Sequence, residues 1–277
     1  MTATAHHLAT GWEEHTPLGD SLVRRYLFHS AAACEAVATA ASGRCLRTPS
    51  FAAADLGVPS GYFNAAVLVQ PPSPHEIDSL LEEIGEFFAD GHGEAMLWSA
   101  WPLPESSMTR HGWQLGGYPP LLARPPAALV PPPVAPSVDI RPVVDPAGLA
   151  AWEQVVVEGY PLPELQPFRA GRLAHPRILD DERMHMWVGY DGAGFAASAG
   201  TLFAEDDIAS LTLGVTRPEA RSAGHWRRQA IERLLAAPDV WVTGVFSDMS
   251  RGPAEGLGFV PVLRLALWIR QRPDQGE

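Results

Sequence analysis

The sequence contains no lysine, and all 20 of its basic residues are arginine. This absence excludes chemistries that need an amine at a fixed place, such as a Walker-type phosphate loop, a Schiff base or the strand lysine of a protein kinase. A codon bias towards arginine, alanine and proline is a sufficient explanation. The formal net charge of −12 argues against binding of a nucleic-acid backbone and mildly favours a cationic or neutral partner.

Cysteine is also scarce, with Cys34 and Cys45 alone. Two cysteines cannot form a disulfide framework, and the ten histidines show no pairing at metal-ligand spacing, so we expect no metal. The first ten residues lack the cationic start and apolar core of a secretory signal. Apolar runs are interrupted too often to provide the roughly 20 residues that cross a bilayer. We therefore expect a cytoplasmic protein with no membrane partner.

Proline is concentrated in one segment. Residues 125–136 read PPAALVPPPVAP, with six prolines in twelve residues, which suits an extended linker and neither a helix nor a central strand. The 277 residues are enough for two domains of ordinary size. We therefore expect an N-terminal lobe over 1–124, a linker over 125–136 and a C-terminal lobe over 137–272.

The two lobes repeat one order of elements. Each has a strand that ends before a proline, an amphipathic helix, a second strand, a glycine followed by an aromatic residue, and a last strand that ends in arginine. Five landmarks keep an offset of 146 or 147 residues between the copies: Pro71 and Pro218, Ile84 and Ile231, Phe87 and Leu234, Gly112 and Gly258, Arg124 and Arg270. The constant offset predicts a diverged internal duplication. Two unrelated lobes with similar spacing are the alternative.

The C-terminal lobe carries further elements in front of this repeat. A strand is expected at 138–143, followed by a helix that Asp145 caps, that has Pro146 in its first turn and that runs to Glu158. A short helix is expected at 169–175, and a hairpin over 184–190 and 195–203. The sequence therefore predicts an α/β protein of two lobes, each a central mixed β-sheet flanked by helices.

One segment has the pattern of a phosphate-binding loop. Residues 217–226, RPEARSAGHW, lie between the strand that ends at Val215 and the helix that carries Ile231. A tight turn that opens a helix exposes backbone N–H groups at the positive end of the helix dipole, and these bind phosphate without lysine. Arg221 can add a charge-assisted hydrogen bond to the same anion. On spacing alone, an ordinary strand-to-helix loop is the alternative.

This part of the chain resembles the acyl-CoA-binding core of the GNAT N-acetyltransferase superfamily. Arg221 and Gly224 match the first half of the family's pyrophosphate loop, Ser247 stands where the family has Asn or Ser, and 257–259, LGF, matches its terminal signature. Two positions depart from the family pattern: Trp226 replaces a small residue, and Ala254 stands where a tyrosine often acts as general acid. The N-terminal lobe resembles a degenerate copy, in which 71–74, PPSP, replaces the loop.

The resemblance implies an acyl-CoA-dependent N-acyltransferase that uses acetyl-CoA or another acyl-CoA as co-substrate and acts on a small-molecule amine by direct transfer. It implies a cofactor site formed by Leu213, Gly214, Val215, Arg221, Ser222, Ala223, Gly224, His225 and Trp226. The strand N–H groups of this set would stabilise the oxyanion. The candidate catalytic residues are Glu158, Ser247 and Asp248, with Glu158 as the first candidate for the base.

Two alternatives stay open on the sequence. One is a GNAT-fold protein that no longer uses acyl-CoA and catalyses a cyclisation, elimination or decarboxylation in the same cleft. The other is a non-catalytic binding module, which would explain the departures at Trp226 and Ala254. No nucleic-acid partner is expected, and the sequence is compatible with a homodimer.

Overall fold

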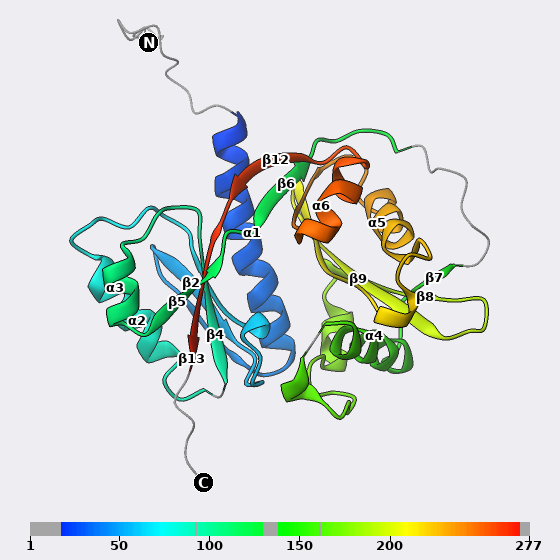
Figure 1. Cartoon of the computed structure of the whole chain (residues 1–277), viewed down its shortest axis with the longest axis horizontal. Helices are drawn as coiled ribbons and strands as arrows, with labels where there is room; N and C mark the ends of the chain where they lie inside the picture. The colour runs from blue at the N-terminus through cyan, green and yellow to red at the C-terminus, as the bar shows by residue number, and fades with distance from the viewer. Residues whose placement is uncertain (1–17, 92, 130–137, 161, 272–277) are drawn as a thin grey trace, which may run out of the picture.

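The computed structural model describes residues 18–91, 93–129, 138–160 and 162–271, which form two lobes side by side with one long helix between them (Figure 1). The helices are α1 (Leu18–Ala40), α2 (Ile77–Phe87), α3 (Glu105–Arg110), α4 (Pro146–Gly159), α5 (His225–Leu235) and α6 (Asp248–Glu255). The strands are β1 (Arg44–Arg47), β2 (Phe51–Asp55), β3 (Asn64–Leu68), β4 (Glu94–Ser99), β5 (Trp113–Gly117), β6 (Pro120–Arg124), β7 (Asp139–Pro142), β8 (Met184–Tyr190), β9 (Ala196–Glu205), β10 (Ile208–Thr216), β11 (Trp241–Val245), β12 (Val260–Arg264) and β13 (Ala266–Gln271). Within these ranges, no helix combines the length and the apolar character that crossing a membrane requires.

Local signals in the sequence place several of these elements. The Asp145 carboxylate accepts a hydrogen bond from the Gly148 N–H at 2.7 Å, and Pro146 occupies the first turn of α4, so the expected helix start is confirmed. The hairpin of β8 and β9 is also confirmed, and Asp191 Oδ1 accepts from the Phe195 N–H at its turn. Most of the expected linker lies outside the described residues, and 125–129 contains no helix or strand.

One expected element is wrong. Residues 169–175 form turns and loop, not a short helix. Gly171 adopts φ +81°, which a right-handed helix cannot contain. The N–H groups of Gly171 and Leu173 donate to the buried carboxylate of Glu153 at 2.7 and 2.5 Å. An acceptor on α4 thus takes the backbone groups that a local helix would have used.

The two sheets have the same pattern of pairing. The first sheet has the order β1-β2-β3-β4-β13-β5, and the second has the order β7-β8-β9-β10-β11-β6-β12. Apart from β7, every strand of the second sheet has a counterpart in the first, with parallel pairing in β3–β4 and β10–β11 and antiparallel pairing elsewhere. Two lobes, each with a mixed sheet and flanking helices, are therefore confirmed, and the topology repeats as the constant sequence offset predicts.

The lobes exchange their last strands. β6 follows the first-lobe elements along the chain but pairs with β11 and β12 in the second sheet. β13 follows the second-lobe elements but pairs with β4 and β5 in the first sheet, where Figure 1 shows it in dark red. The segments 1–124 and 137–272 therefore do not close their sheets alone. Each sheet is completed by backbone hydrogen bonds to a strand from the other segment.

An arginine near the end of each exchanged strand, the last residue of β6 and the second-to-last residue of β13, lies against a glycine of the receiving lobe. Arg124 on β6 lies beside Gly258, where an added Cβ would be 3.5 Å from the arginine Nε, and this Nε donates to the Leu257 carbonyl at 3.0 Å. Arg270 on β13 lies beside Gly112 in the same way, at 3.6 Å. Both glycines have positive φ, +77° at Gly112 and +90° at Gly258, which also disfavours a side chain. Two of the repeated landmarks are therefore contacts between the two halves of the chain.

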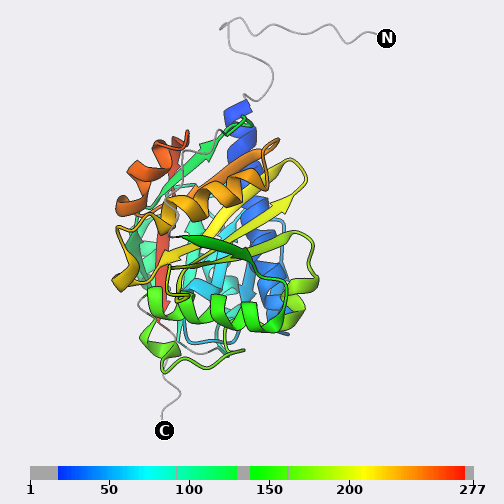
Figure 2. The ribbon, with the colours of Figure 1, turned by 90° about the vertical axis from the view of Figure 1, so that its right-hand side faces the viewer.

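Helix α1 belongs to the cores of both lobes. Its residues Leu27 and Ala31 share an apolar cluster with Val67 of β3 and Leu121 of β6. Nearer its end, Ala36 joins the cluster formed by α4 and one face of the second sheet. α2 and α3 cover the far face of the first sheet, and α5 and α6 cover the far face of the second. Figure 2 shows α4 and α5 on either side of the second sheet's strands.

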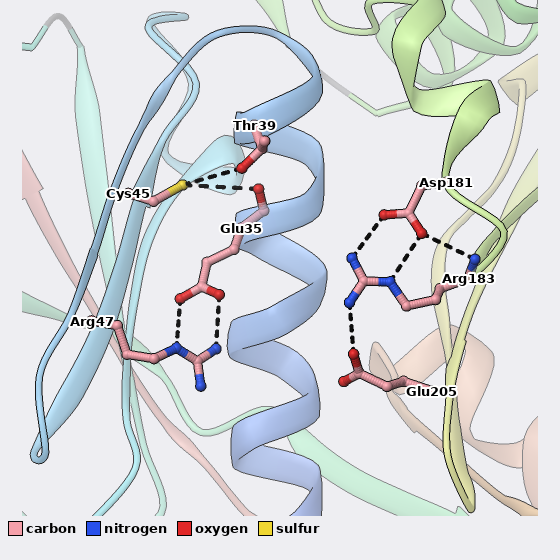
Figure 3. A network of polar contacts seen from close by, with 7 residues as sticks. All are labelled: Glu35, Thr39, Cys45, Arg47, Asp181, Arg183 and Glu205. Atoms are coloured by element: carbon pink, nitrogen blue, oxygen red, sulfur yellow. Dashed lines mark hydrogen bonds and ion pairs between the residues drawn. The ribbon is translucent and has the colours of Figure 1, made fainter.

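Ion pairs flank α1 on both sides (Figure 3). Glu35 on α1 accepts two hydrogen bonds from the Arg47 guanidinium of β1, at 2.8 and 2.9 Å. Across the helix, Arg183 pairs with Asp181 at 2.8 Å and with Glu205 at 2.6 Å. The carboxylates on either side of this part of α1 are therefore neutralised by arginine.

His29 is a buried polar residue at the contact of α1 with the second sheet. It is 2% exposed, its Nε2 lies 3.1 Å from Ser210 Oγ, and its ring packs on Phe203. Burial lowers the pKa of His29 from 6.5 to about 4, and the nearby Glu205 opposes this only in part. The folded protein therefore keeps this imidazole neutral at pH values where the unfolded chain binds a proton.

Packing of the exchanged strand should control the stability of the whole molecule. Trp268 on β13 is 5% exposed in the first lobe's core, so we expect Trp268→Ala to lower the free energy of unfolding by about 3–5 kcal/mol. Urea denaturation followed by near-UV circular dichroism measures the change, with Val260→Ala on β12, 53% exposed, as the control. Interlocked lobes should unfold in one transition, and two separate transitions would contradict the exchange.

The neutral His29 predicts a loss of stability in acid. Between pH 6.5 and about 4 the unfolded chain binds this proton and the folded protein does not, so stability falls with falling pH by about 3 kcal/mol. His29→Gln removes the titrating group and should show a smaller loss over this window by about that amount. Urea denaturation at a series of pH values tests this, and parallel pH profiles for the two proteins would show that His29 is not buried neutral.

Candidate functional site

A large cavity crosses the second lobe and reaches α1. Its volume is about 1200 Å³, more than the roughly 300–1,000 Å³ of ordinary small-ligand pockets. The parallel pairing of β10 with β11 covers only 208–210 and 241–243, and beyond it the two strands separate. Gly214, Gly244 and Phe246 line the cavity at this separation. An added Cβ at Gly244 would lie 2.8 Å from the Phe246 ring, so the glycine leaves room for the ring beside the gap.

The loop between β10 and α5 forms one end of the cavity. Arg221, Ser222 and Gly224 line it and are exposed. Ser222 and Gly224 have φ of +65° and +83°, the left-handed conformation found in backbone anion nests. Gly224 is the N-cap of α5 and has no side chain to cap it, and the helix bonds begin with the Arg228 N–H to the Gly224 carbonyl at 3.0 Å. The first N–H groups of α5 can therefore bind an anion at the positive end of the helix dipole.

Strand β10 bulges in the middle of the cavity. Its register with β9 runs from Ile208 to Thr212 and resumes at Val215, so Leu213 and Gly214 have no opposite residue. Leu213 has φ +47°, a strained conformation for a leucine. A bulge interrupts the ladder and leaves its backbone groups available to a ligand.

Two side chains hold this bulge from opposite faces of the sheet. Arg233 on α5 donates from Nη1 to the carbonyls of Thr201 and Thr212, both at 3.3 Å. Tyr160, the residue after α4, donates from its hydroxyl to the Gly214 carbonyl at 3.2 Å. Since α4 and α5 cover opposite faces of the sheet, the bulge is fixed from both.

Arg233 places a buried positive charge at the bulge. It is 2% exposed, and burial lowers its pKa to about 10, which leaves it protonated at neutral pH. Within the described residues no carboxylate pairs with it, and its hydrogen bonds go to backbone carbonyls. Added Cβ atoms at Gly200 and Gly214 would lie 2.9 and 3.0 Å from the guanidinium, so both glycines make room for it. A buried cation without a counter-ion costs stability, which points to a functional reason for its presence.

His225 and Trp226 open α5 and line the cavity. His225 is 3% exposed with Nδ1 3.4 Å from Ser198 Oγ, and burial lowers the pKa of its ring. The Trp226 indole packs edge-to-face on Phe246, with the ring centroids 6.3 Å apart. The large side chain at this position is thus accommodated in the apolar cluster of α5 and α6 and forms part of the cavity wall.

The three candidate catalytic residues differ in position. Ser247 lines the cavity, and its Oγ lies 3.0 Å from Ser250 Oγ. Asp248 is exposed at the start of α6 and does not line the cavity. Glu158 pairs with Arg217 at 2.7 Å and does not line the cavity either. The structure therefore brings Ser247 together with eight of the nine expected cofactor-binding residues, while Ala223 and the two carboxylates do not line the cavity.

Sequence reasoning missed the two residues that hold the bulge. The family pattern draws attention to position 254, where Ala254 is fully buried in α6 and has no hydroxyl. Tyr160 reaches the bulge from α4 instead, and burial raises its pKa to about 12, so it stays a hydrogen-bond donor at neutral pH. A signal for Arg233 was present, because Ala230 three residues before it and Ala237 four residues after it place this arginine on the apolar side of its helix.

The first lobe has no comparable loop. Where the second lobe has the turn before α5, the first has residues 71–74, PPSP, and its three prolines have no N–H to offer an anion. A metal centre is not indicated either. In the part of the chain that the structure describes, no group of three or more His, Cys, Asp or Glu side chains is placed to hold a metal ion.

Comparison with known proteins shows a likeness in structure. No protein-family model and no curated protein sequence matches the chain. A GCN5-related N-acetyltransferase from Kribbella flavida is 18% identical, with a TM-score of 0.61 over 89% of this chain and 96% of that one. A tandem GNAT protein from the clavulanic acid biosynthesis pathway is 16% identical, with a TM-score of 0.53 over 93% and 97%. A putative GNAT-family acetyltransferase from Novosphingobium aromaticivorans is 16% identical, with a TM-score of 0.50 over 83% and 91%. At these identities the likeness shows the fold.

A buried carboxylate of α4 holds part of the cavity wall in place, so its replacement should destabilise that wall. Glu153, 1% exposed, accepts hydrogen bonds from the N–H groups of Gly171, Leu173 and Ala174, and the last two residues line the cavity. We expect Glu153→Gln to lower the free energy of unfolding by about 1–3 kcal/mol, because the amide turns an N–H towards an N–H donor. Hydrogen exchange of the 171–174 amides should accelerate. Unchanged exchange, or the same effect from Glu182→Gln at an exposed position, would contradict the anchoring role.

Proposed function

We propose that this chain, which has the fold of the tandem GNAT proteins, is an acyl-CoA-dependent N-acyltransferase that acts on a small amine. One observation carries the proposal: a single cavity joins a loop with free helix N–H groups to a bulge in the neighbouring strand. The first feature suits a diphosphate, and the second suits a carbonyl that becomes an oxyanion. Such a pair of sites in one cavity fits a long thioester better than a compact ligand.

The loop end of the cavity supports binding of a diphosphate without lysine. The N–H groups of Ser222 to Trp226 are the proposed ligands, and the backbone turns at Ser222 and Gly224 direct them. Arg221 and Arg227 also line this end, and they add positive charge to a protein that is acidic as a whole. This mode of diphosphate binding does not need a lysine side chain, which the sequence lacks.

The bulge supports the chemistry of acyl transfer. Acyl-CoA, as co-substrate, would supply an activated acyl group at the gap between β10 and β11. In direct transfer, the amine nitrogen forms a bond to the acyl carbon while the bond from that carbon to sulfur breaks, and the proton that the nitrogen loses ends on the thiolate sulfur. Backbone N–H groups near Leu213 to Val215 would stabilise the negative charge on the carbonyl oxygen, and the nearby Arg233 guanidinium would lower its energy further. The thiolate is a tolerable leaving group near neutral pH, so Ala254 in place of a tyrosine acid does not prevent the reaction.

The proposal assigns no role as base to Glu158. Its carboxylate is held by the buried Arg217, and it does not line the cavity. Asp248 does not line the cavity either, although its neighbours Ser247 and Met249 do. Ser247 stays in the proposed site as a lining residue at the gap, where its hydroxyl can contact the bound thioester arm.

Acetyl-CoA should stabilise the folded protein. At a concentration one hundred times its dissociation constant, a ligand of the folded state adds about 2.7 kcal/mol to the free energy of unfolding and raises the melting temperature. Thermal denaturation with acetyl-CoA, malonyl-CoA and free CoA measures this. Absence of any shift with all three would contradict the transferase and would favour a GNAT-fold protein that has lost its acyl-CoA.

A matched pair of glycine variants locates the binding. Gly224→Val forces a β-branched residue to φ +83° in the loop, and we expect at least about tenfold weaker binding of acetyl-CoA. Gly57→Val imposes the same strain at φ +78° in the first lobe, and an added Cβ meets no atom within 4 Å at either position. The control should bind acetyl-CoA as the parent does. Equal losses in the two variants would show that the loop is not the binding site.

A further inference from the structure

The part of the cavity that lies between the lobes has aromatic and aliphatic walls. We call it the interlobe chamber and define it by six lining residues: Tyr26, Ser30 and Cys34 of α1, Tyr62 of the first lobe, Trp152 of α4 and Met186 of β8. Trp152 and Met186 belong to the apolar cluster of α4, whereas the loop opens α5 on the opposite face of the sheet, so an acceptor in the chamber would approach the bulge from the side opposite the proposed phosphate-binding loop. The walls of the chamber therefore set which acceptor can enter.

No carboxylate lines the cavity among the described residues. The lining includes Arg221, Arg227 and Arg233, so the formal charges of the walls are positive. The thiol of Cys34 does not change this, because burial raises its pKa to about 12 and keeps it uncharged. Arg233 is the charged group nearest the bulge, and no counter-ion offsets it there.

Five acidic residues around the chamber are held by other partners. Glu35 on α1 binds Arg47, and Asp181 and Glu205 bind Arg183 (Figure 3). On α4, Glu153 accepts three backbone N–H groups and Glu158 pairs with Arg217; all of these carboxylates lie outside the cavity lining. A protonated amine in the chamber would therefore have neither a counter-ion nor a carboxylate to take its proton.

Three buried polar atoms of the cavity wall make no hydrogen bond within the described residues: Thr201 Oγ1, Thr216 Oγ1 and Trp152 Nε1. Thr201 lines the cavity on β9, is 2% exposed, and its Oγ1 makes no hydrogen bond within the described residues. Thr201 is paired with Thr212, directly beside the bulge. A buried hydroxyl without a partner costs free energy unless a ligand satisfies it. An N–H group of an acceptor next to the bulge can donate to this oxygen.

We infer that the acceptor is an uncharged aryl amine whose ring lies in the interlobe chamber and whose nitrogen lies beside the bulge. This inference rests on the proposed transferase function. The lone pair of an aryl amine is delocalised into the ring, so the nitrogen is unprotonated at neutral pH and needs neither a counter-ion nor a base before it attacks. An alkyl amine, with a pKa of about 10 like that of lysine, would enter as an ammonium ion. Burial of that ion without a counter-ion is unfavourable.

Two isomeric amines test this directly. 4-Ethylaniline and 2-phenylethylamine have the same atoms and similar size, but only the second is charged at pH 7. Calorimetry with the full chain should give at least about tenfold tighter binding of 4-ethylaniline, because the ammonium ion loses its hydration without compensation. Equal or tighter binding of 2-phenylethylamine would show that the aromatic walls attract cations, and would overturn the inference. Failure of both isomers to bind at millimolar concentration would also overturn it.

A charge placed in the chamber should reverse this preference. Cys34→Asp adds a carboxylate to the α1 wall, and Cys34→Asn adds the same shape without the charge. The first variant should shift the ratio of the two dissociation constants towards 2-phenylethylamine by at least about tenfold relative to the second. Identical ratios in both variants would show that the amines bind elsewhere and would overturn the inference. If both variants misfold by circular dichroism, the isomer comparison on the parent protein still decides it.

The amine measurements are independent of the acyl donor. If acetyl-CoA fails to stabilise the protein while 4-ethylaniline still binds in preference to its isomer, the proposed function fails and the ligand class of the chamber stands. If acetyl-CoA binds and 2-phenylethylamine is preferred, the function stands and the acceptor class is wrong.

Discussion

The exchange of β6 and β13 is the constraint on which the rest of the structure depends. Because each strand completes the sheet of the other lobe, neither sheet is complete with strands from one half of the chain. The same exchange surrounds α1 with strands from both sheets, as the cluster of Leu27, Val67 and Leu121 shows. α1 then supplies one wall of the cavity through Tyr26, Ser30 and Cys34. The chamber between the lobes is therefore set by the topology of the chain.

The charge of the cavity lining differs in sign from the net charge of the whole chain. The net charge of −12 favours a cationic or neutral partner when the chain is considered as a whole. The described lining of the cavity has the opposite character, with three arginines and no carboxylate. The acidic side chains nearby bind arginines or backbone N–H groups and do not line the cavity. Composition thus describes the surface, and the local arrangement decides what the site can bind.

Much of the fold could be predicted from the sequence because its signals are local. The periodicity of α2, the cap at Asp145, the hairpin turn at Asp191 and the constant offset of the repeat each depend on residues near one another or on simple spacing. The strand exchange could not be predicted, because pairing partners of β6 and β13 lie more than a hundred residues away. Even so, Arg124 and Arg270 were visible as repeated positions, and only the structure shows that each contacts the other lobe.

The contiguous segments of the candidate site could also be predicted from the sequence, but the contacts between distant residues could not. The loop from Arg221 to Trp226 and the strand at Leu213 to Val215 are contiguous segments with a recognisable pattern, and the structure brings them to one cavity. Tyr160 and Arg233 act through contacts with the sheet, and although spacing places Arg233 on the apolar face of its helix, it does not show which backbone groups either residue binds. The choice of Glu158 as a base depended on its position at the end of a helix, and the sequence could not show that Arg217 holds its carboxylate.

A crystal structure of the full chain with acetyl-CoA tests the central claim most directly. The account predicts a diphosphate that accepts hydrogen bonds from the N–H groups of Ser222 to Trp226 and a thioester carbonyl at the bulge of β10 near Gly214. A diphosphate bound at another place, or a soaked crystal with an empty loop at saturating acetyl-CoA, would contradict it.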